Sequence, residues 1–280
     1  MTLTLDLLGY RARVTAPDGA MLTQVAAIFD DLRVPDDEPV DTMHYRIACD
    51  DATGWSLSVN DERVYTGAGC ADMLIALEWQ LVTDLVAHRR DWFHLHAAAL
   101  ADPSGSCGVL IVGVSGSGKT TLTLALMASG FLPYADDVTL IAPETLMPHA
   151  LRRAFHADDA TRALVGALGA SPVWRSAALP DGYALPVRWA TADVPIRFVL
   201  FPTLAPGEPP ALVPLSVADA VVALLPYSMT LSHDPALALA VAARLTRDAR
   251  CFALSTGDLG ATAACVRALV AGECSPTSES

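Results

Sequence analysis

Eight consecutive residues, GVSGSGKT from Gly113 to Thr120, combine three glycines with the single lysine of the chain. Glycines at this spacing let successive backbone N–H groups converge on phosphate oxygens at a helix N-terminus, where the helix dipole favours negative charge. The ammonium of Lys119 can act there as a compact point charge between two phosphates, a role for which a planar guanidinium is unsuited. This explains why a lysine stands at this position in a chain whose other 17 Lys and Arg residues are all arginine. The stretch predicts a site for the phosphates of a nucleotide.

The residues predicted to bind the nucleotide belong to this loop and to the start of the element after it. Thr120 can also bind Mg²⁺ through its hydroxyl. The apolar run Val109–Val112 predicts a buried strand before the loop, and TLTLALMA predicts a helix that ends at Gly130. Strand, glycine loop and helix in this order support the assignment of the binding residues, which are Gly113, Ser115, Gly116, Ser117, Gly118, Lys119, Thr120 and Thr121.

Two adjacent carboxylates, Asp136 and Asp137, follow the lysine after only 17 residues. They come at the end of a predicted strand, FLPYA, and precede another, VTLI. Neighbouring residues of a strand point to opposite faces, so the two carboxylates can have different roles. One can bind Mg²⁺ directly or through water, and the other can accept a proton from a hydroxyl group.

Composition narrows the classes of function. The 280 residues suffice for one large domain or two smaller ones. The net charge of -13 argues against a nucleic-acid partner, because phosphate backbones attract basic surfaces. No apolar run approaches the length of about 20 residues that a bilayer requires, and no signal peptide is recognised. The six cysteines are scattered and lack metal-ligand spacing, so we expect them to be reduced thiols. Together these features predict a soluble cytoplasmic protein without a membrane partner.

Along the chain, the pattern predicts an α/β protein in three parts. Residues 1–90 read as a β-rich segment packed with a helix near 70–87, and residues 91–271 as a domain built around the glycine loop. Residues 272–280 read as a disordered tail. The later domain is expected to contain strands at IRFVLF and CFAL and helices near 217–225, 235–246 and 258–269.

Several segments between residues 93 and 270 resemble the HPr kinase/phosphorylase family and its stand-alone relatives, which include lasso-peptide kinases. The resemblance rests on LHAAALAD with His96, on GVLIVGVSGSGKTTLTLALMASG, on YADDVTLI and on FVLFPTLAPGEPPALVPLSVADAVVALL. The ending RDARCFALSTGDLGATAACVRALV is also similar. The resemblance implies a P-loop mixed sheet of the type shared with phosphoenolpyruvate carboxykinase. Relatives form rings, so the resemblance also allows a homo-oligomer.

The resemblance further implies roles for the site residues. Asp136 would be the general base, His96 its partner, and Asp137 together with Thr120 would bind Mg²⁺, while Lys119 contacts the phosphates. The implied activity is an ATP- and Mg²⁺-dependent kinase that phosphorylates a serine or threonine hydroxyl of a peptide or small protein. A small-molecule alcohol kinase and a nucleotide-binding regulatory ATPase are the alternatives. His94 is a weaker candidate for the site than His96.

Two departures from the family pattern bear on the acceptor. Residues 1–90 do not resemble the regulatory domain of HPr kinase, and Thr203 stands where many relatives have arginine after Phe-Pro. HPr itself is therefore not the expected acceptor. Basic residues that could contact a phosphate or an acidic substrate are Arg152, Arg153, Arg197, Arg244 and Arg247.

Overall fold

The computed structural model describes residues 1–35, 42–50, 54–169, 173–175 and 179–274. The chain divides into two compact units. The second comprises Asp91–Leu151, Phe155–Arg175 and Pro186–Ser280. The first comprises Met1–Arg90 together with Arg152–Ala154 and Ser176–Leu185, two later returns of the chain that the division into 1–90 and 91–271 does not anticipate.

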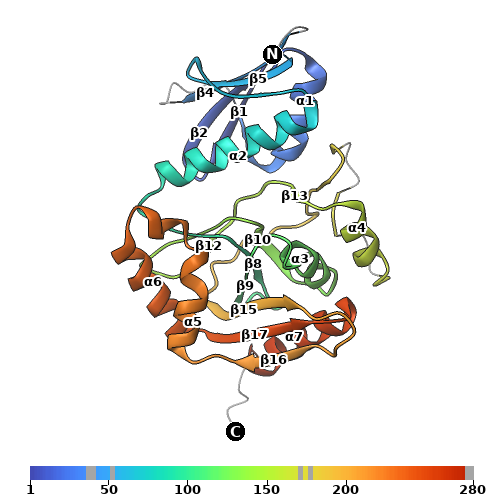
Figure 1. Ribbon diagram of the computed structural model, residues 1–280, viewed down its shortest axis with the longest axis vertical. Helices are drawn as coiled ribbons and strands as arrows, with labels where there is room; N and C mark the ends of the chain where they lie inside the picture. The colour runs from blue at the N-terminus through green and yellow to red at the C-terminus, as the bar shows by residue number, and fades with distance from the viewer. Residues whose placement is uncertain (36–41, 51–53, 170–172, 176–178, 275–280) are drawn as a thin grey trace. The chain divides into compact units, whose positions relative to one another are not determined.

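Unit 1 contains a six-stranded sheet of order β3-β1-β2-β4-β5-β6, in which only β2 and β4 pair in parallel. Asn60 and Asp61, which connect β5 to β6, both have positive φ, as a tight hairpin turn requires. Helix α2 packs against β2, β5 and β6 (Figure 1). The elements are β1 (Thr2–Leu7), β2 (Tyr10–Thr15), α1 (Gly19–Ile28), η1 (Asp30–Leu32), β3 (Arg33–Val34), β4 (Met43–Asp50), β5 (Gly54–Val59), β6 (Glu62–Gly67), α2 (Cys70–His88) and β14 (Tyr183–Ala184).

A buried ion pair ties the returning segments to the rest of unit 1. Arg153 and Glu78 are 4% and 3% exposed and form a salt bridge. The Tyr183 hydroxyl donates a hydrogen bond of 3.0 Å to Glu78 Oε2. Burial, together with the charge and hydrogen bond of Glu78, raises the pKa of Tyr183. Arg153, one of the arginines predicted as candidate substrate contacts, therefore has a structural role.

Unit 2 contains a mixed six-stranded sheet of order β10-β8-β9-β15-β17-β16. Strands β9, β15 and β17 run parallel, and the other pairs are antiparallel. Helices α3 and α7 lie on one side of this sheet and α5 and α6 on the other (Figure 1). The strands are β8 (Ala97–Ala101), β9 (Gly108–Val112), β10 (Leu132–Ala135), β15 (Ile196–Leu204), β16 (Ala211–Pro214) and β17 (Arg250–Thr256). The helices are α3 (Lys119–Ala128), α4 (Asp159–Gly166), α5 (Val217–Leu224), α6 (Pro235–Asp248) and α7 (Leu259–Cys274).

A smaller sheet of order β12-β11-β7 completes unit 2. Its strands are β7 (Phe93–Leu95), β11 (Thr139–Ile141) and β12 (Pro148–His149). The short elements β13 (Phe155–His156), η2 (Leu225–Tyr227) and η3 (Met229–Ser232) also belong to this unit. A mixed α/β architecture is thus observed, as the sequence predicts.

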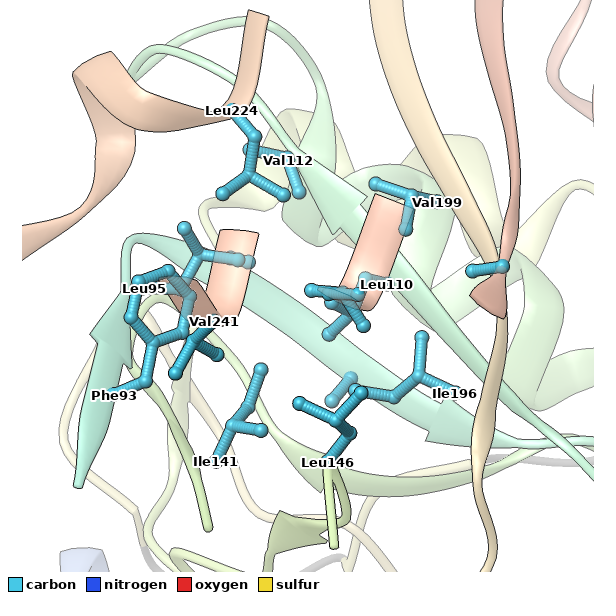
Figure 2. Packing of buried hydrophobic residues seen from close by; sticks show 14 of the residues in the cluster. Phe93, Leu95, Leu110, Val112, Ile141, Leu146, Ile196, Val199, Leu224 and Val241 are labelled. Carbon is cyan, nitrogen blue, oxygen red and sulfur yellow. The ribbon is translucent and has the colours of Figure 1, made fainter. Parts of the chain in front are cut away.

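The core of unit 2 joins the small sheet to the large one. Figure 2 shows Phe93 and Leu95 of β7 near Val241 of α6, with Leu110 of β9 in the same cluster. Strand β9 is buried at every residue, which explains why its sequence is an unbroken apolar run and does not alternate. The cluster fixes the ends of β7 and β9, and these ends carry the residues of the candidate site.

The C-terminal helix is longer than the sequence predicts. Its observed span, α7, reaches Cys274, so residues 272–274 of the predicted tail are helical. Residues 275–280 of that tail lie outside the described residues. Among the described helices, none combines the length and the apolar character that are needed to cross a bilayer.

Candidate functional site

Strand register brings the glycine loop and the two aspartates together. In the large sheet Ala97, the first residue of β8, pairs with Val112, the last residue of β9. His96 directly precedes Ala97 and Gly113 directly follows Val112, so both lie at the same edge of the sheet. Strands β10 and β11 pair with β8 and β7 respectively. The break between β7 and β8 at His96 therefore lies beside the break between β10 and β11, which contains Asp136 and Asp137.

The backbone of the loop between β9 and α3 has a shape that could hold an anion. Gly116 and Gly118 have φ values of 79° and 85°, in the left-handed region that glycine enters without steric cost. A Cβ atom on Gly113 would approach Ser117 Oγ to 2.7 Å, so a larger residue here would have to displace the Ser117 hydroxyl. No side chain of the described residues caps the N-terminus of α3, which leaves its dipole available to an anion.

Lys119 lies across this loop. It is 6% exposed, and its Nζ donates hydrogen bonds to the carbonyl oxygens of Gly113 at 2.8 Å and Val114 at 3.0 Å. Burial lowers the pKa of the ammonium, and the negative charges of Asp137 and Asp136 oppose this shift. The cation thus has nearby carboxylates and backbone acceptors but no formal ion pair of its own among the described residues.

Thr120 and Asp136 form the second part of the site. The Thr120 hydroxyl donates to Asp136 Oδ2 over 2.8 Å, and Asp136 is 4% exposed. In the described residues no cluster of three His, Cys, Asp or Glu side chains could hold a metal ion by itself. Mg²⁺ in phosphoryl-transfer sites needs only one or two protein oxygens, because phosphates and waters complete its shell. The Thr120 and Asp136 oxygens fit this requirement.

His96 connects Lys119 to the second aspartate. Its Nε2 lies 3.1 Å from Lys119 Nζ and its Nδ1 3.4 Å from Asp137 Oδ1. An ammonium can only donate, so Nε2 accepts and the ring proton lies on Nδ1, facing the carboxylate. Burial lowers the pKa of His96 and outweighs the opposite effect of Asp137, and the Lys119 charge lowers it further. Neutral His96 is the form that results.

Asp137 occupies a strained turn. Its φ of 70° lies in the left-handed region, and the Val138 N–H donates to the Asp136 carbonyl over 2.9 Å. These features are those of the rare γ-turn with positive φ at its centre. The turn separates the two carboxylates: Asp136 is buried beside Thr120, whereas the Asp137 side chain is 47% exposed beside His96.

The observed contacts differ from the roles that the resemblance implies. The aspartate at ion-pair distance from His96 is Asp137, and the one bonded to Thr120 is Asp136. Asp136 directly follows β10 and is buried beside Thr120, whereas the turn with positive φ at Asp137 leaves that side chain exposed beside His96.

The structure brings most, but not all, of the other predicted residues to the loop. Ser115 and Gly116 are exposed at its tip. Thr121 instead contacts Thr161 of α4, with their hydroxyl oxygens 3.2 Å apart. His94 is fully buried within β7, near the ring of His233, so it does not share the exposure of His96. Arg244 donates to the carbonyl oxygens of Pro143 and Glu144, which are not residues of the loop.

A pocket beside the loop contains residues that sequence reasoning missed. It has a volume of about 360 Å³ and is lined by His96, by Val114 and Ser115, and by the segment Pro226–Met229. That segment lies between two predicted helices and has no periodic pattern. Its only sequence signal is Pro226, which marks the end of a helix.

Comparisons with known proteins do not extend these observations. No family model matches the chain, and a search of curated proteins finds no match.

Proposed function

We propose that the chain is an ATP- and Mg²⁺-dependent kinase that transfers the γ-phosphoryl group to a serine or threonine hydroxyl of a peptide or small protein. One observation carries the proposal. The two functional side chains that begin α3 each contact one half of the acidic site: Thr120 bonds to Asp136, and Lys119 contacts His96, which lies beside Asp137. In this arrangement phosphate binding and hydroxyl activation would be adjacent.

The phosphates would be held by the glycine loop. The backbone N–H groups from Gly116 to Thr120 and the ammonium of Lys119 would bind the β- and γ-phosphates. Thr120 and Asp136 would hold Mg²⁺, which neutralises charge that develops on the phosphate oxygens. This assigns Asp136 to the metal and reverses the roles implied by the resemblance.

The hydroxyl would be activated by His96 and Asp137. Its proton passes to this pair while its oxygen bonds to the γ-phosphorus, and the bond from the γ-phosphorus to the β–γ bridging oxygen breaks. The electron pair of that bond remains on the terminal phosphate of ADP. The exposure of Asp137 supports this assignment, because a base must reach an incoming substrate and Asp136 is buried.

The choice of a peptide or small protein as the acceptor rests only on the sequence resemblance to HPr kinase relatives. The fold type that they imply, a P-loop mixed sheet, is supported by the order of strand, loop and helix in unit 2. A small-molecule alcohol kinase would use the same loop and acidic pair. A regulatory ATPase has less support, since a protein that only binds nucleotide needs no acid–base pair beside the γ-phosphate.

A labelling experiment tests the proposal. The protein is incubated with Mg²⁺, γ-labelled ATP and an extract of the source cells, and labelled products are separated by size. We expect label on serine or threonine of a peptide or protein, and its loss in Lys119→Met and Asp137→Asn. Label found only in a small metabolite would indicate the small-molecule kinase, and label found only as free phosphate would indicate an ATPase.

A further inference from the structure

The pocket next to His96 lies on the side of the loop where the transferred phosphoryl group would be. Lysines of such loops contact the β- and γ-phosphates. Since His96 Nε2 is 3.1 Å from Lys119 Nζ, the lining residue His96 adjoins the γ-phosphate end of the nucleotide site. The Mg²⁺ side, with Thr120 and Asp136, contributes no residue to the lining of this pocket.

One wall of the pocket is preorganised by backbone hydrogen bonds to the chain segment that carries His96. The His96 N–H donates to the Tyr227 carbonyl over 2.8 Å, and Leu95 forms an isolated β-bridge with Ser228. The His94 N–H donates to Thr230 Oγ1 over 2.9 Å. The wall and the histidine are therefore held in a fixed relation, which a site for an acceptor group requires.

The character of the lining restricts what can bind there. Val114, Pro226 and Met229 are apolar, Tyr227 is aromatic, and His96 is the only lining residue that can carry a charge. Val114 is 59% exposed, so its apolar side chain is accessible to a ligand. A sugar or a free amino acid would leave several hydroxyls or two charges without partners against these walls, which is costly.

One polar group of the lining is left without a partner. Ser228 is 8% exposed, and within the described part of the chain its hydroxyl has no hydrogen-bond partner. Buried hydroxyls are normally paired, and the Ser228 oxygen has almost no exposed surface, so an external polar group would pair with it only after the side chain turns toward the pocket. A peptide backbone supplies such groups on either side of a serine.

We propose that this pocket binds the acceptor as a serine-containing peptide segment whose residues next to the serine are apolar, with Tyr227 and Met229 determining this preference. The inference rests on the proposed kinase function and deepens it. The serine hydroxyl faces His96 and Asp137, and an apolar neighbour of the serine packs against Met229 and Tyr227.

A peptide library tests the preference. The protein phosphorylates, with MgATP, a library of peptides that have one central serine and randomised neighbours, and phosphopeptides are identified by mass spectrometry. We expect leucine, methionine and other apolar residues to be enriched at least about three-fold next to the phosphorylated serine, a modest value for contacts with one apolar pocket. Lys119→Met must abolish all phosphopeptides.

Two charge-introducing variants distinguish a role in recognition from a role in folding. Met229→Glu should select lysine and arginine beside the serine, and Met229→Lys should select aspartate and glutamate. A variant that merely folds poorly cannot acquire opposite new preferences. Leu239→Glu, a matched change at a side chain of α6 that is 52% exposed, should keep the apolar preference.

The outcomes separate this inference from the kinase proposal. If phosphopeptides form but show no apolar enrichment, or if the two Met229 variants keep the original preference, the pocket does not determine the acceptor, while the kinase function stands. If no peptide is phosphorylated in a Lys119-dependent reaction, the peptide kinase fails and the pocket inference fails with it.

Discussion

Lys119 Nζ lies 3.1 Å from His96 Nε2, so the only lysine of the chain contacts the histidine that lines the pocket proposed for the acceptor. The same ammonium bonds to two carbonyl groups of the loop. A nucleotide that draws Lys119 onto its phosphates would release Nε2 of His96, which is the ring atom that can then accept a proton. Binding of the phosphates and activation of the acceptor would thus be coupled through one contact.

Replacement of Lys119 should weaken nucleotide binding whether or not charge is kept. A hydrogen bond to a charged group contributes about 1.5–3 kcal/mol, so Lys119→Met should lower the affinity for MgATP at least about ten-fold. Lys119→Arg should lower it similarly, because the buried site suits an ammonium and not a planar fork. Isothermal titration with MgATP measures both, and Arg267→Met on the exposed face of α7 is the control. Wild-type affinity in the arginine variant would contradict this explanation of the single lysine.

Replacing each of the two aspartates should change a different kinetic quantity. Asp136→Asn should raise the Mg²⁺ concentration for half-maximal activity about 10- to 100-fold, since Asp136 shares the metal side with Thr120. Asp137→Asn should lower kcat by about 10² to 10⁴ with an unchanged Mg²⁺ requirement, because it lies beside His96. Steady-state rates over a range of Mg²⁺ concentrations distinguish the two. The opposite pattern would restore the roles that the family resemblance implies.

Close packing inside the loop predicts a stability defect and its rescue. In Gly113→Ala the new methyl group would meet Ser117 Oγ at 2.7 Å, and such overpacking costs about 1–3 kcal/mol. Ser117→Ala removes that oxygen and leaves its Cβ at 3.4 Å, an ordinary contact. The double variant should therefore recover much of the loss in urea denaturation. A single variant as stable as the wild type would show that the loop adapts to the methyl group.

Removing only one partner of the buried ion pair in unit 1 should destabilise the protein. Arg153→Met leaves Glu78 charged in a site where it is 3% exposed, and such a change costs about 3–5 kcal/mol. Combining it with Glu78→Leu should reduce the loss, since no unpaired charge remains. Denaturant unfolding of the single and double variants measures the difference. Additive losses would mean that the two side chains act independently.

The local sequence pattern was sufficient to predict the elements around the loop. It was not sufficient to predict contacts between residues that are distant in the sequence. The strand at Val109–Val112, the helix of TLTLALMA and the turn at Asn60-Asp61 follow from periodicity and glycine spacing, and all are observed. The pairing of His96 with Asp137 depends on a turn with positive φ at a non-glycine residue, which no propensity indicates. Likewise, Arg153 finds Glu78 across 75 residues of chain, and only the folded structure reveals this partner.

Asp102 is the first residue of the loop between β8 and β9. It should make the stability of the protein depend on pH. Its carboxylate accepts hydrogen bonds from the backbone N–H groups of Ser104, Ser106 and Cys107 at 3.0, 2.6 and 2.7 Å. Burial alone would raise the pKa of Asp102, but these bonds and that of the Ser104 hydroxyl outweigh it, so its pKa lies below the usual 3.8. The carboxylate therefore stabilises the fold above the unfolded-state pKa, and this contribution is lost as pH falls through the folded-state pKa.

Asp102→Asn should accordingly lower the free energy of unfolding by about 1–3 kcal/mol at pH 7, because three backbone donors lose a charged acceptor. The difference from the wild type should persist down to about pH 5 and shrink at lower pH, where the wild-type carboxylate becomes protonated. Urea denaturation between these pH values and about pH 3 measures it. Asp181→Asn, a matched change at an exposed position, should have little effect at any pH. A loss in Asp102→Asn that stays constant as the pH falls would show that the ionised carboxylate contributes nothing beyond its shape.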